Sequence, residues 1–428
     1  MSILVGFSVL HFLQKDLDAF VVQDVDGVDA MRIIYQGGFA KSPWYSVFDN
    51  YGVPCMFSTL ESKAHSKRKR MISNVYSKSL VMSSEAAKAQ SHVIMFNRLL
   101  PLLKDEAAKS QGGTEVQSLF MATTMDLISA LIGMSGWTFT YRATIITSGP
   151  RSCPSSQGCS NELECASILH LSTMPMTNCA PGTNIVVFNA MQQGIRKEEK
   201  VEGHRSILYE TTIQQRDASI ASEILDQVLA GHETAGIVLT YASWHLSKSP
   251  GLQAQLREEL LPLIPCGEDI LPDARKLDGL PLLNAIVMET LRLHAPIPGP
   301  QPRQTPYPGS HIEGHFIPGG VRIASLAHTL HLNEAVFSKA AIWNPNRWLE
   351  SSDQDTMKRH FWAFGSGGRM CIGSNFALQE MKTVISIIYV NFTTTIMDDS
   401  GIEQTDGYSA RPKADRLFLR FRRVSDTI

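Results

Sequence analysis

The chain has 428 residues, of which 43% are hydrophobic and 19% are charged, and its formal net charge at pH 7 is −2. This is the composition of an ordinary globular protein, and it offers no basic excess for binding nucleic acid. The length exceeds the roughly 250–300 residues at which a single hydrophobic core usually stops growing. Several layers or a large cofactor must therefore organise the interior.

The N-terminal segment Met1–Leu13 is apolar but short. It contains His11 and is followed by Lys15 and Asp16, so it falls short of the ~20 apolar residues that span a bilayer. It also lacks the basic start and the small-residue cleavage site of a secretory signal. We interpret residues 1–23 as an N-terminal remnant without a membrane anchor, which favours a cytosolic location.

The next segment, Asp24–Met82, has an orderly pattern. A helix is expected to begin within Val28–Tyr35, and an aromatic loop, Ser42–Tyr51, follows. We expect its aromatic side chains to pack in the core, with pocket lining as the alternative. The only strong basic run follows, from His65 to Arg70.

Between 136 and 194 the periodicity disappears, and we expect an irregular segment there. Four of the seven cysteines lie in it: Cys153, Cys159, Cys165 and Cys179. Their spacings lack the short pairs of zinc sites, and the odd, uneven set of seven is not a disulfide framework. A loop of this length is unusual in a compact domain, so a disordered insertion or translated non-coding sequence are the alternatives.

Strong helical periodicity returns after Ala218, with apolar residues on one stripe. We expect one long helix from Ala218 to Leu246, which Pro250 and Gly251 follow. The further expected elements are a helix Leu252–Leu260, a helix Asp278–Leu293, a proline-rich run Pro296–Pro308 and a strand within Gly320–Leu326. The order indicates a mainly helical fold with small sheets.

One cysteine lies between a glycine-rich loop and a helix. The segment Phe364–Gly373 reads FGSGGRMCIG, and the helical sequence Asn375–Met381 follows. Glycines let backbone N–H groups approach the Cys371 sulfur, and the positive end of the helix favours a thiolate, as an iron ligand requires. A buried inert cysteine or a phosphate-binding loop would explain only part of this string.

The whole string closely resembles the haem-binding loop of the cytochrome P450 family, Phe-x-x-Gly-x-Arg-x-Cys-x-Gly. Its fixed positions are filled by Phe364, Gly367, Arg369, Cys371 and Gly373. The resemblance implies that Cys371 is the axial ligand of haem b, iron protoporphyrin IX. It also implies a single domain over 1–428, mainly α with small β-sheets, with the haem between a long central helix and the cysteine-bearing loop.

A second motif, Ala230–Gly236 (AGHETAG), lies inside the long predicted helix. An acid beside an alcohol is suited to proton transfer. The flanking glycines weaken the backbone hydrogen bonds of the helix, so that the Thr234 hydroxyl can bond to a freed carbonyl oxygen and a groove can open. The alternative is that the glycines serve close helix packing and that Glu233 is merely solvated.

This motif resembles the oxygen-activation motif of the same family, Ala/Gly-Gly-x-Asp/Glu-Thr-Thr/Ser. The resemblance implies that Thr234 hydrogen-bonds dioxygen and that Glu233 feeds a proton relay. The chain departs from the motif at Ala235, where a second hydroxyl is common.

A third motif, Glu289-Thr290-Leu291-Arg292, places an acid and an arginine on one helix face. By itself it could be a surface ion pair of little consequence. It resembles the family's Glu-x-x-Arg pair, which a downstream arginine in Pro-x-Arg-Trp/Phe completes. Arg347 in Pro345–Trp348 fills that position, so the resemblance implies a structural triad.

Haem propionates are anionic and require donors. By resemblance Arg369 and Arg303 supply them, and His65 and Lys69 stand where the family has a Trp-x-x-x-Arg pair. The basic run from His65 to Arg70 is also a candidate docking surface for an acidic electron donor, with a solvated helix face as the alternative.

The resemblance covers Asp24–Met82 and Ala218–Val424 and is greatest to membrane-bound fungal members that oxidise specialised metabolites. It implies a monooxygenase that inserts one atom of O2 into a small apolar molecule, using electrons from NADPH through NADPH–cytochrome P450 reductase. Association with the endoplasmic reticulum membrane is implied, or a cytosolic location if the missing anchor is genuine. The alternatives are a defective haem-binding protein without turnover and a reductase-independent haem-thiolate isomerase, against which Thr234 argues.

Overall fold

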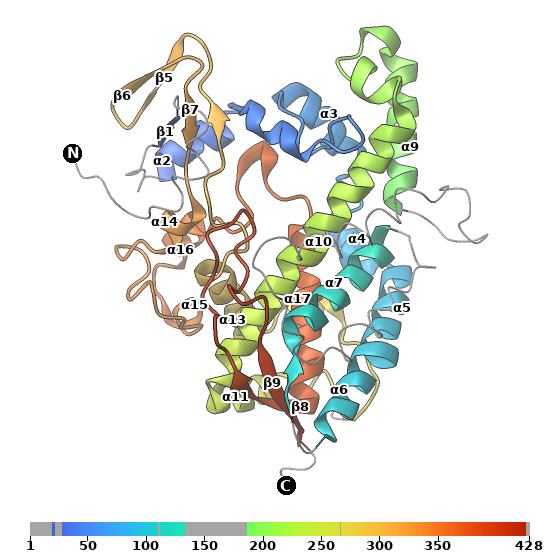
Figure 1. Ribbon diagram of the computed structural model, residues 1–428, viewed down its shortest axis with the longest axis vertical. Helices are drawn as coiled ribbons and strands as arrows, with labels where there is room; N and C mark the ends of the chain where they lie inside the picture. Colours follow the sequence, from blue (N-terminus) through green and yellow to red (C-terminus); the bar gives the residue numbers. More distant parts are fainter. Residues whose placement is uncertain (1–18, 22–27, 110–111, 133–185, 266, 425–428) are drawn as a thin grey trace, which may run out of the picture.

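The computed structural model describes residues 19–21, 28–109, 112–132, 186–265 and 267–424. The expectations for Met1–Leu13 and for the four clustered cysteines fall outside these residues. Within them the chain is mostly helical with three small sheets, which confirms the predicted fold class (Figure 1).

The α-helices of the described residues are α2 (Val28–Met31), α3 (Ser62–Ile72), α4 (Lys78–Ser83), α5 (Glu85–Ile94), α6 (Leu100–Ala107), α7 (Val116–Ile132), α9 (Val186–Val201), α10 (Arg216–Ser247), α11 (Pro250–Leu260), α12 (Ala274–Asp278), α13 (Pro281–Leu293), α14 (Ala327–His331), α15 (Arg347–Glu350), α16 (Gln354–His360) and α17 (Ser374–Asn391). The strands are β1 (Ala19–Val21), β2 (Ala40–Lys41), β3 (Thr114–Glu115), β4 (Arg303–Gln304), β5 (Gly309–Ile312), β6 (His315–Pro318), β7 (Arg322–Ala324), β8 (Phe392–Asp398) and β9 (Phe418–Arg423).

The largest sheet has the strand order β1-β7-β4-β2. Its β2–β4 pair is antiparallel and places Lys41 directly opposite Arg303. The strand expected within Gly320–Leu326 is β7, which starts only at Arg322 because Gly320 has a φ of 83° that turns the backbone. The other two sheets are the hairpin β5–β6 and the set β3-β9-β8.

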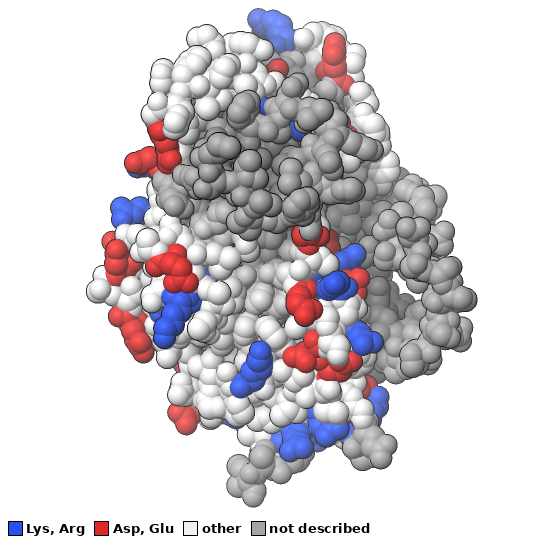
Figure 2. Space-filling view, turned by 60° about the vertical axis from the view of Figure 1, so that its left-hand side comes forward, with Lys and Arg blue, Asp and Glu red and all other residues white. Residues whose placement is uncertain are grey.

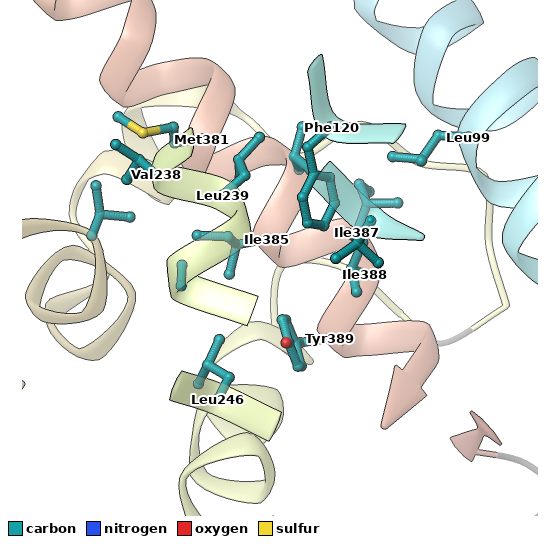
Figure 3. Packing of buried hydrophobic residues seen from close by; sticks show 14 of the residues in the cluster. Leu99, Phe120, Val238, Leu239, Leu246, Met381, Ile385, Ile387, Ile388 and Tyr389 are labelled. Carbon is teal, nitrogen blue, oxygen red and sulfur yellow. The ribbon is translucent and has the colours of Figure 1, made fainter. Parts of the chain in front are cut away.

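The core lies where α10 crosses α17 and α7 (Figures 1 and 3). Val238 and Leu239 of α10 pack near Met381 and Ile385 of α17, and all four are almost fully buried. Burying such side chains stabilises the fold by about 1.5–3 kcal/mol each. The long helix predicted over Ala218–Leu246 is present and runs from Arg216 to Ser247.

Three expected elements differ in detail. Residues 186–194, which were predicted to be irregular, belong to α9, on which Val187, Met191 and Ile195 form a buried stripe at four-residue spacing. The helix expected over Asp278–Leu293 is two helices: α12 ends at Asp278 and α13 starts at Pro281, whose ring suits the first helical turn. The helix expected in Val28–Tyr35 is α2 followed by a π-helical turn, Arg32–Gln36.

Two further features of the described residues are the hydropathy of the helices and the distribution of surface charge. No helix among the described residues is long and apolar enough to cross a bilayer. Basic and acidic side chains are intermixed over the described part of the face in Figure 2, in keeping with the small net charge.

Candidate active site

Cys371 ends a loop whose conformation requires glycine. Gly365 and Gly367 have φ values of 65° and 69°, which residues with a Cβ rarely adopt. At Gly367 a Cβ would also lie 2.5 Å from the Tyr35 carbonyl oxygen. The Cys371 N–H then donates to the Phe364 carbonyl at 2.9 Å, which closes the loop before α17 begins.

The Cys371 sulfur faces the N-terminus of α17. Burial raises the pKa of the thiol, whereas hydrogen bonds from the Gly373 and Ser374 N–H groups and the charge of Lys69 lower it, and the net pKa is raised. The residue is nevertheless exposed to solvent contact. Because the residue is accessible although many protein atoms surround its sulfur, we infer a recess beside the sulfur, which we call the hollow. Because burial outweighs the local donors, a bound cation is needed to hold the thiolate.

Two buried cations, Lys41 and Arg303, lie together with the partly buried Arg369 of this loop. Lys41 and Arg303 are 4% and 5% exposed and face each other across β2 and β4, and Arg369 is close to both. Burial, then Arg303 and Arg369, hold the pKa of Lys41 well below its usual range. Burial and then Arg303 likewise lower the pKa of Arg369 to about 10.

These cations have neutral partners. Lys41 donates to the Phe57 carbonyl, and Arg369 donates to the Thr59 and Leu60 carbonyls. Arg303 donates to the Pro302 carbonyl at 3.0 Å. Within the described part of the chain none of the three forms an ion pair with a carboxylate, and the buried Nε of Arg369 has no acceptor. Buried like charges of this kind require an anion, so the cluster fits the two carboxylates of a haem.

His65 and Lys69 on α3 complete the basic cluster. His65 is buried, and burial, followed by the charges of Arg369, Lys41 and Lys69, lowers its pKa to about 3, so the imidazole is neutral. Lys69 donates to the Gly368 and Met370 carbonyls at 3.0 and 2.9 Å, and so ties α3 to the cysteine loop. Sequence reasoning missed Lys41, because only the β2–β4 register reveals its place beside Arg303.

The AGHETAG motif lies in the middle of α10, which is unbroken there. The Thr234 hydroxyl donates to the Ala230 carbonyl at 2.8 Å. A Cβ on Gly231 would lie 2.5 Å from Ile128, and one on Gly236 would lie 2.9 Å from Met121, so both glycines allow α7 to approach closely. The packing interpretation of the glycines therefore holds, and the expected opening of the helix is not seen.

One face of α10 carries a row of residues that are not fully buried. Its residues recur at helical spacing: Asp226, Leu229, Ala230, Glu233 and Thr234. We call these residues the accessible stripe. The Asp226 charge raises the pKa of Cys371, so Asp226 lies within electrostatic range of the sulfur. The sequence analysis predicted Glu233 and Thr234 at this site but did not identify Asp226, which lies about two helical turns before Glu233 on the same side of α10.

The structure brings Glu289, Arg292 and Arg347 together in the core. Glu289 is fully buried and accepts two hydrogen bonds from Arg292, at 2.8 and 2.9 Å, and one from Arg347 at 3.0 Å. The Trp348 indole and the Asn344 N–H also donate to its carboxylate. This hydrogen-bonded network joins α13 to α15 in the core.

Comparison with known proteins agrees with this geometry. The sequence pattern of the family described as "Cytochrome P450" matches residues 192–416, more than half of the chain. The chain belongs to the cytochrome P450 family. It therefore has the family's fold, a haem cofactor is implied, and the enzyme is a monooxygenase.

Curated relatives are fungal. The cytochrome P450 monooxygenase hkm5 of Aspergillus hancockii is 26% identical over 94% of this chain and 81% of its own length. The cytochrome P450 monooxygenase avaI of Aspergillus versicolor is 27% identical over 79% of this chain and 83% of its own length. The cytochrome P450 monooxygenase ankB of Aspergillus thermomutatus is 35% identical, but over only 44% of this chain and 37% of its own length.

A solved structure supports the fold. The crystal structure of the cytochrome P450DA heme domain superposes with a TM-score of 0.65, at 20% identity, over 93% of this chain and 86% of that one. At this level of identity the match bears on the fold alone.

Proposed function

We propose that the protein is a haem-thiolate monooxygenase that inserts one atom of O2 into a small, largely apolar molecule of fungal secondary metabolism. One observation carries the proposal. The Cys371 thiol borders the hollow, within electrostatic range of the accessible stripe of α10 and beside buried cations that lack a carboxylate partner.

Haem b fits the residues around this hollow. Cys371 would ligate the iron, and Arg303, Arg369, His65 and Lys69 would face the propionates. Phe364, Gly367 and Gly373 shape the loop that holds the sulfur. When bound, the haem supplies the reduction of O2 and the transfer of one oxygen atom.

The chain's own contribution is proton handling and positioning. The Thr234 hydroxyl donates its proton to the Ala230 carbonyl, which leaves its oxygen able to accept a hydrogen bond. Glu233 is adjacent, partly exposed, and has no hydrogen bond or ion pair among the described residues. A carboxyl group of this kind can exchange protons with water and pass them toward Thr234.

Electrons would come from NADPH through NADPH–cytochrome P450 reductase at the endoplasmic reticulum membrane. The basic run on α3 is less free for docking than the sequence indicates. Lys67 pairs with Glu198 and Glu202 at 2.5 and 2.6 Å, and Arg68 is buried. Lys63 and Arg70 remain exposed, so a reductase contact here would rest on these two side chains.

The test is turnover of the holoenzyme with reductase, NADPH and isotopically labelled dioxygen. A monooxygenase transfers one labelled atom to product for each NADPH consumed. In Thr234→Val most of the electrons from NADPH should reduce O2 to hydrogen peroxide. The control is Thr240→Val, which removes a similar hydrogen bond of 2.8 Å between a hydroxyl and a carbonyl elsewhere on α10 and should not increase peroxide formation. Product without NADPH or label would instead identify an isomerase, and haem binding without product from a broad substrate panel would favour the non-catalytic alternative.

A further inference from the structure

Asp226 is the acidic residue of the accessible stripe that no motif assigns. It precedes Glu233 by seven residues, which places both on one side of α10. Burial and then the neighbouring Glu223 raise the pKa of Asp226 to about 7, while the Cys55 thiol, which donates a hydrogen bond, and Lys41 lower it. Burial and the nearby Glu223 destabilise the ionised form of this carboxyl group, which makes Asp226 a candidate for ligand binding.

The neighbouring Glu223 provides the contrast. Its carboxylate accepts hydrogen bonds from the Met56 N–H at 2.7 Å and from Gln227 at 2.9 Å, and Arg68 lies 3.9 Å away. Glu223 is therefore satisfied within the protein. Asp226, by comparison, forms no ion pair with any described residue, and its hydrogen-bond partner is the weakly donating thiol of Cys55.

An aromatic cluster belongs to the segment that packs against α10 one turn before Asp226, where the Asn50 side chain donates to the Ser222 carbonyl and the Met56 N–H donates to Glu223. The ring centroids of Phe48 and Tyr408 are 5.0 Å apart, those of Trp44 and Phe48 are 5.5 Å apart, and those of Trp44 and Tyr408 are 5.9 Å apart. The cluster extends to Tyr45 and Phe57, and the Lys41 Nζ lies 3.9 and 3.6 Å from the centroids of these two rings. The faces of aromatic rings attract cations.

A second, independent observation points to a ligand. The Tyr408 hydroxyl is buried and has no hydrogen-bond partner among the described residues. Burial, Tyr45 and then Asp226 raise its pKa, so this hydroxyl lies near the Asp226 carboxylate. Buried polar groups are rarely left unpaired, so this hydroxyl is a candidate hydrogen-bonding group for a ligand.

We propose that Asp226, the Tyr408 hydroxyl and the rings of Trp44 and Phe48 bind a cationic nitrogen of the substrate, an amine or a quaternary ammonium. The inference rests on the proposed function and defines its substrate as an apolar molecule with one basic end. The apolar part would lie along Leu229 and Ala230 toward Thr234. Eight residues of helix separate Asp226 from Thr234, so the oxidised carbon lies roughly 12 Å from the nitrogen.

The test compares two probes that differ only in charge, benzyltrimethylammonium and its neutral isostere neopentylbenzene. A quaternary nitrogen has no lone pair, so it cannot ligate the iron. Calorimetric titration of the holoenzyme should show at least tenfold tighter binding of the cation. Asp226→Asn should remove that preference and leave the affinity for the neutral probe unchanged, and Tyr408→Phe should reduce it severalfold.

The matched control is Asp217→Asn, which removes an exposed carboxylate from the first turn of the same helix and should change neither affinity. Equal affinity of the wild-type protein for the two probes overturns the inference without any variant, as does an unaltered preference in Asp226→Asn. Each sample is first tested for its carbon monoxide spectrum. An abnormal wild-type spectrum overturns the proposed function, whereas a normal spectrum with no preference for the cation overturns only the substrate class.

Discussion

Glu289 and Asp226 are both enclosed carboxylates, one in the core and one on the accessible stripe of α10. Glu289 receives hydrogen bonds from two arginines, an indole and a backbone N–H. Asp226 has a thiol as its hydrogen-bond partner and an acid, Glu223, as its neighbour. The difference indicates that a carboxylate whose hydrogen bonds all come from the protein stabilises the fold, whereas a carboxylate with few protein donors can bind a ligand.

The largest effect should follow from breaking the saturated network. Glu289→Gln leaves Arg292 and Arg347 buried without a counter-charge, and removing one partner of such a network costs about 3–5 kcal/mol. Urea unfolding should show this loss, and the variant should bind little haem. Glu350→Gln, an exposed change on α15, should stay within about 0.5 kcal/mol of the wild-type protein. A stable Glu289→Gln protein would contradict the structural role.

A smaller effect is expected for Lys41→Met, which should stabilise the protein without haem but weaken its hold on haem. Lys41→Met removes one of three clustered like charges, two of them buried, so the protein without haem should become more stable. With haem bound the same change removes a partner of the propionates, and haem transfer to apomyoglobin should accelerate about tenfold, or about 1.4 kcal/mol. Lys63→Met, on the exposed side of α3, should change neither measurement. Slower haem loss from Lys41→Met would contradict the assignment of the basic cluster.

The smallest effect concerns pH. Because the pKa of Asp226 is raised to about 7, its carboxylate is mostly neutral below that pH and charged above it. Affinity for benzyltrimethylammonium, which carries its charge at every pH, should therefore rise severalfold between pH 6 and pH 8, in titrations with about one-unit pH steps. The groups around Asp226 are Glu223 on α10, Cys55 in the loop packed against it, and Lys41 on β2. In Asp226→Asn the affinity should be flat across this range.

The sequence predicted the parts of the site that depend on local spacing. The cysteine loop, the Glu289–Arg292 pair and the long helix each lie within one continuous segment, where fixed spacing determines geometry. Lys41, Asp226 and Tyr408 were not predicted. Lys41 acquires its role from the register of β2 against β4, and the cation site requires three distant segments to meet. The start of α9 was missed because its apolar stripe follows a segment without periodicity.

The central claim is that Cys371 ligates a haem iron through its thiolate. The most direct measurement is the difference spectrum of the dithionite-reduced protein with and without carbon monoxide, compared with Cys371→Ala. We expect a red-shifted Soret band in the wild-type protein that is absent from the variant. A soluble wild-type protein that binds no haem, or an unchanged band in Cys371→Ala, would contradict the account.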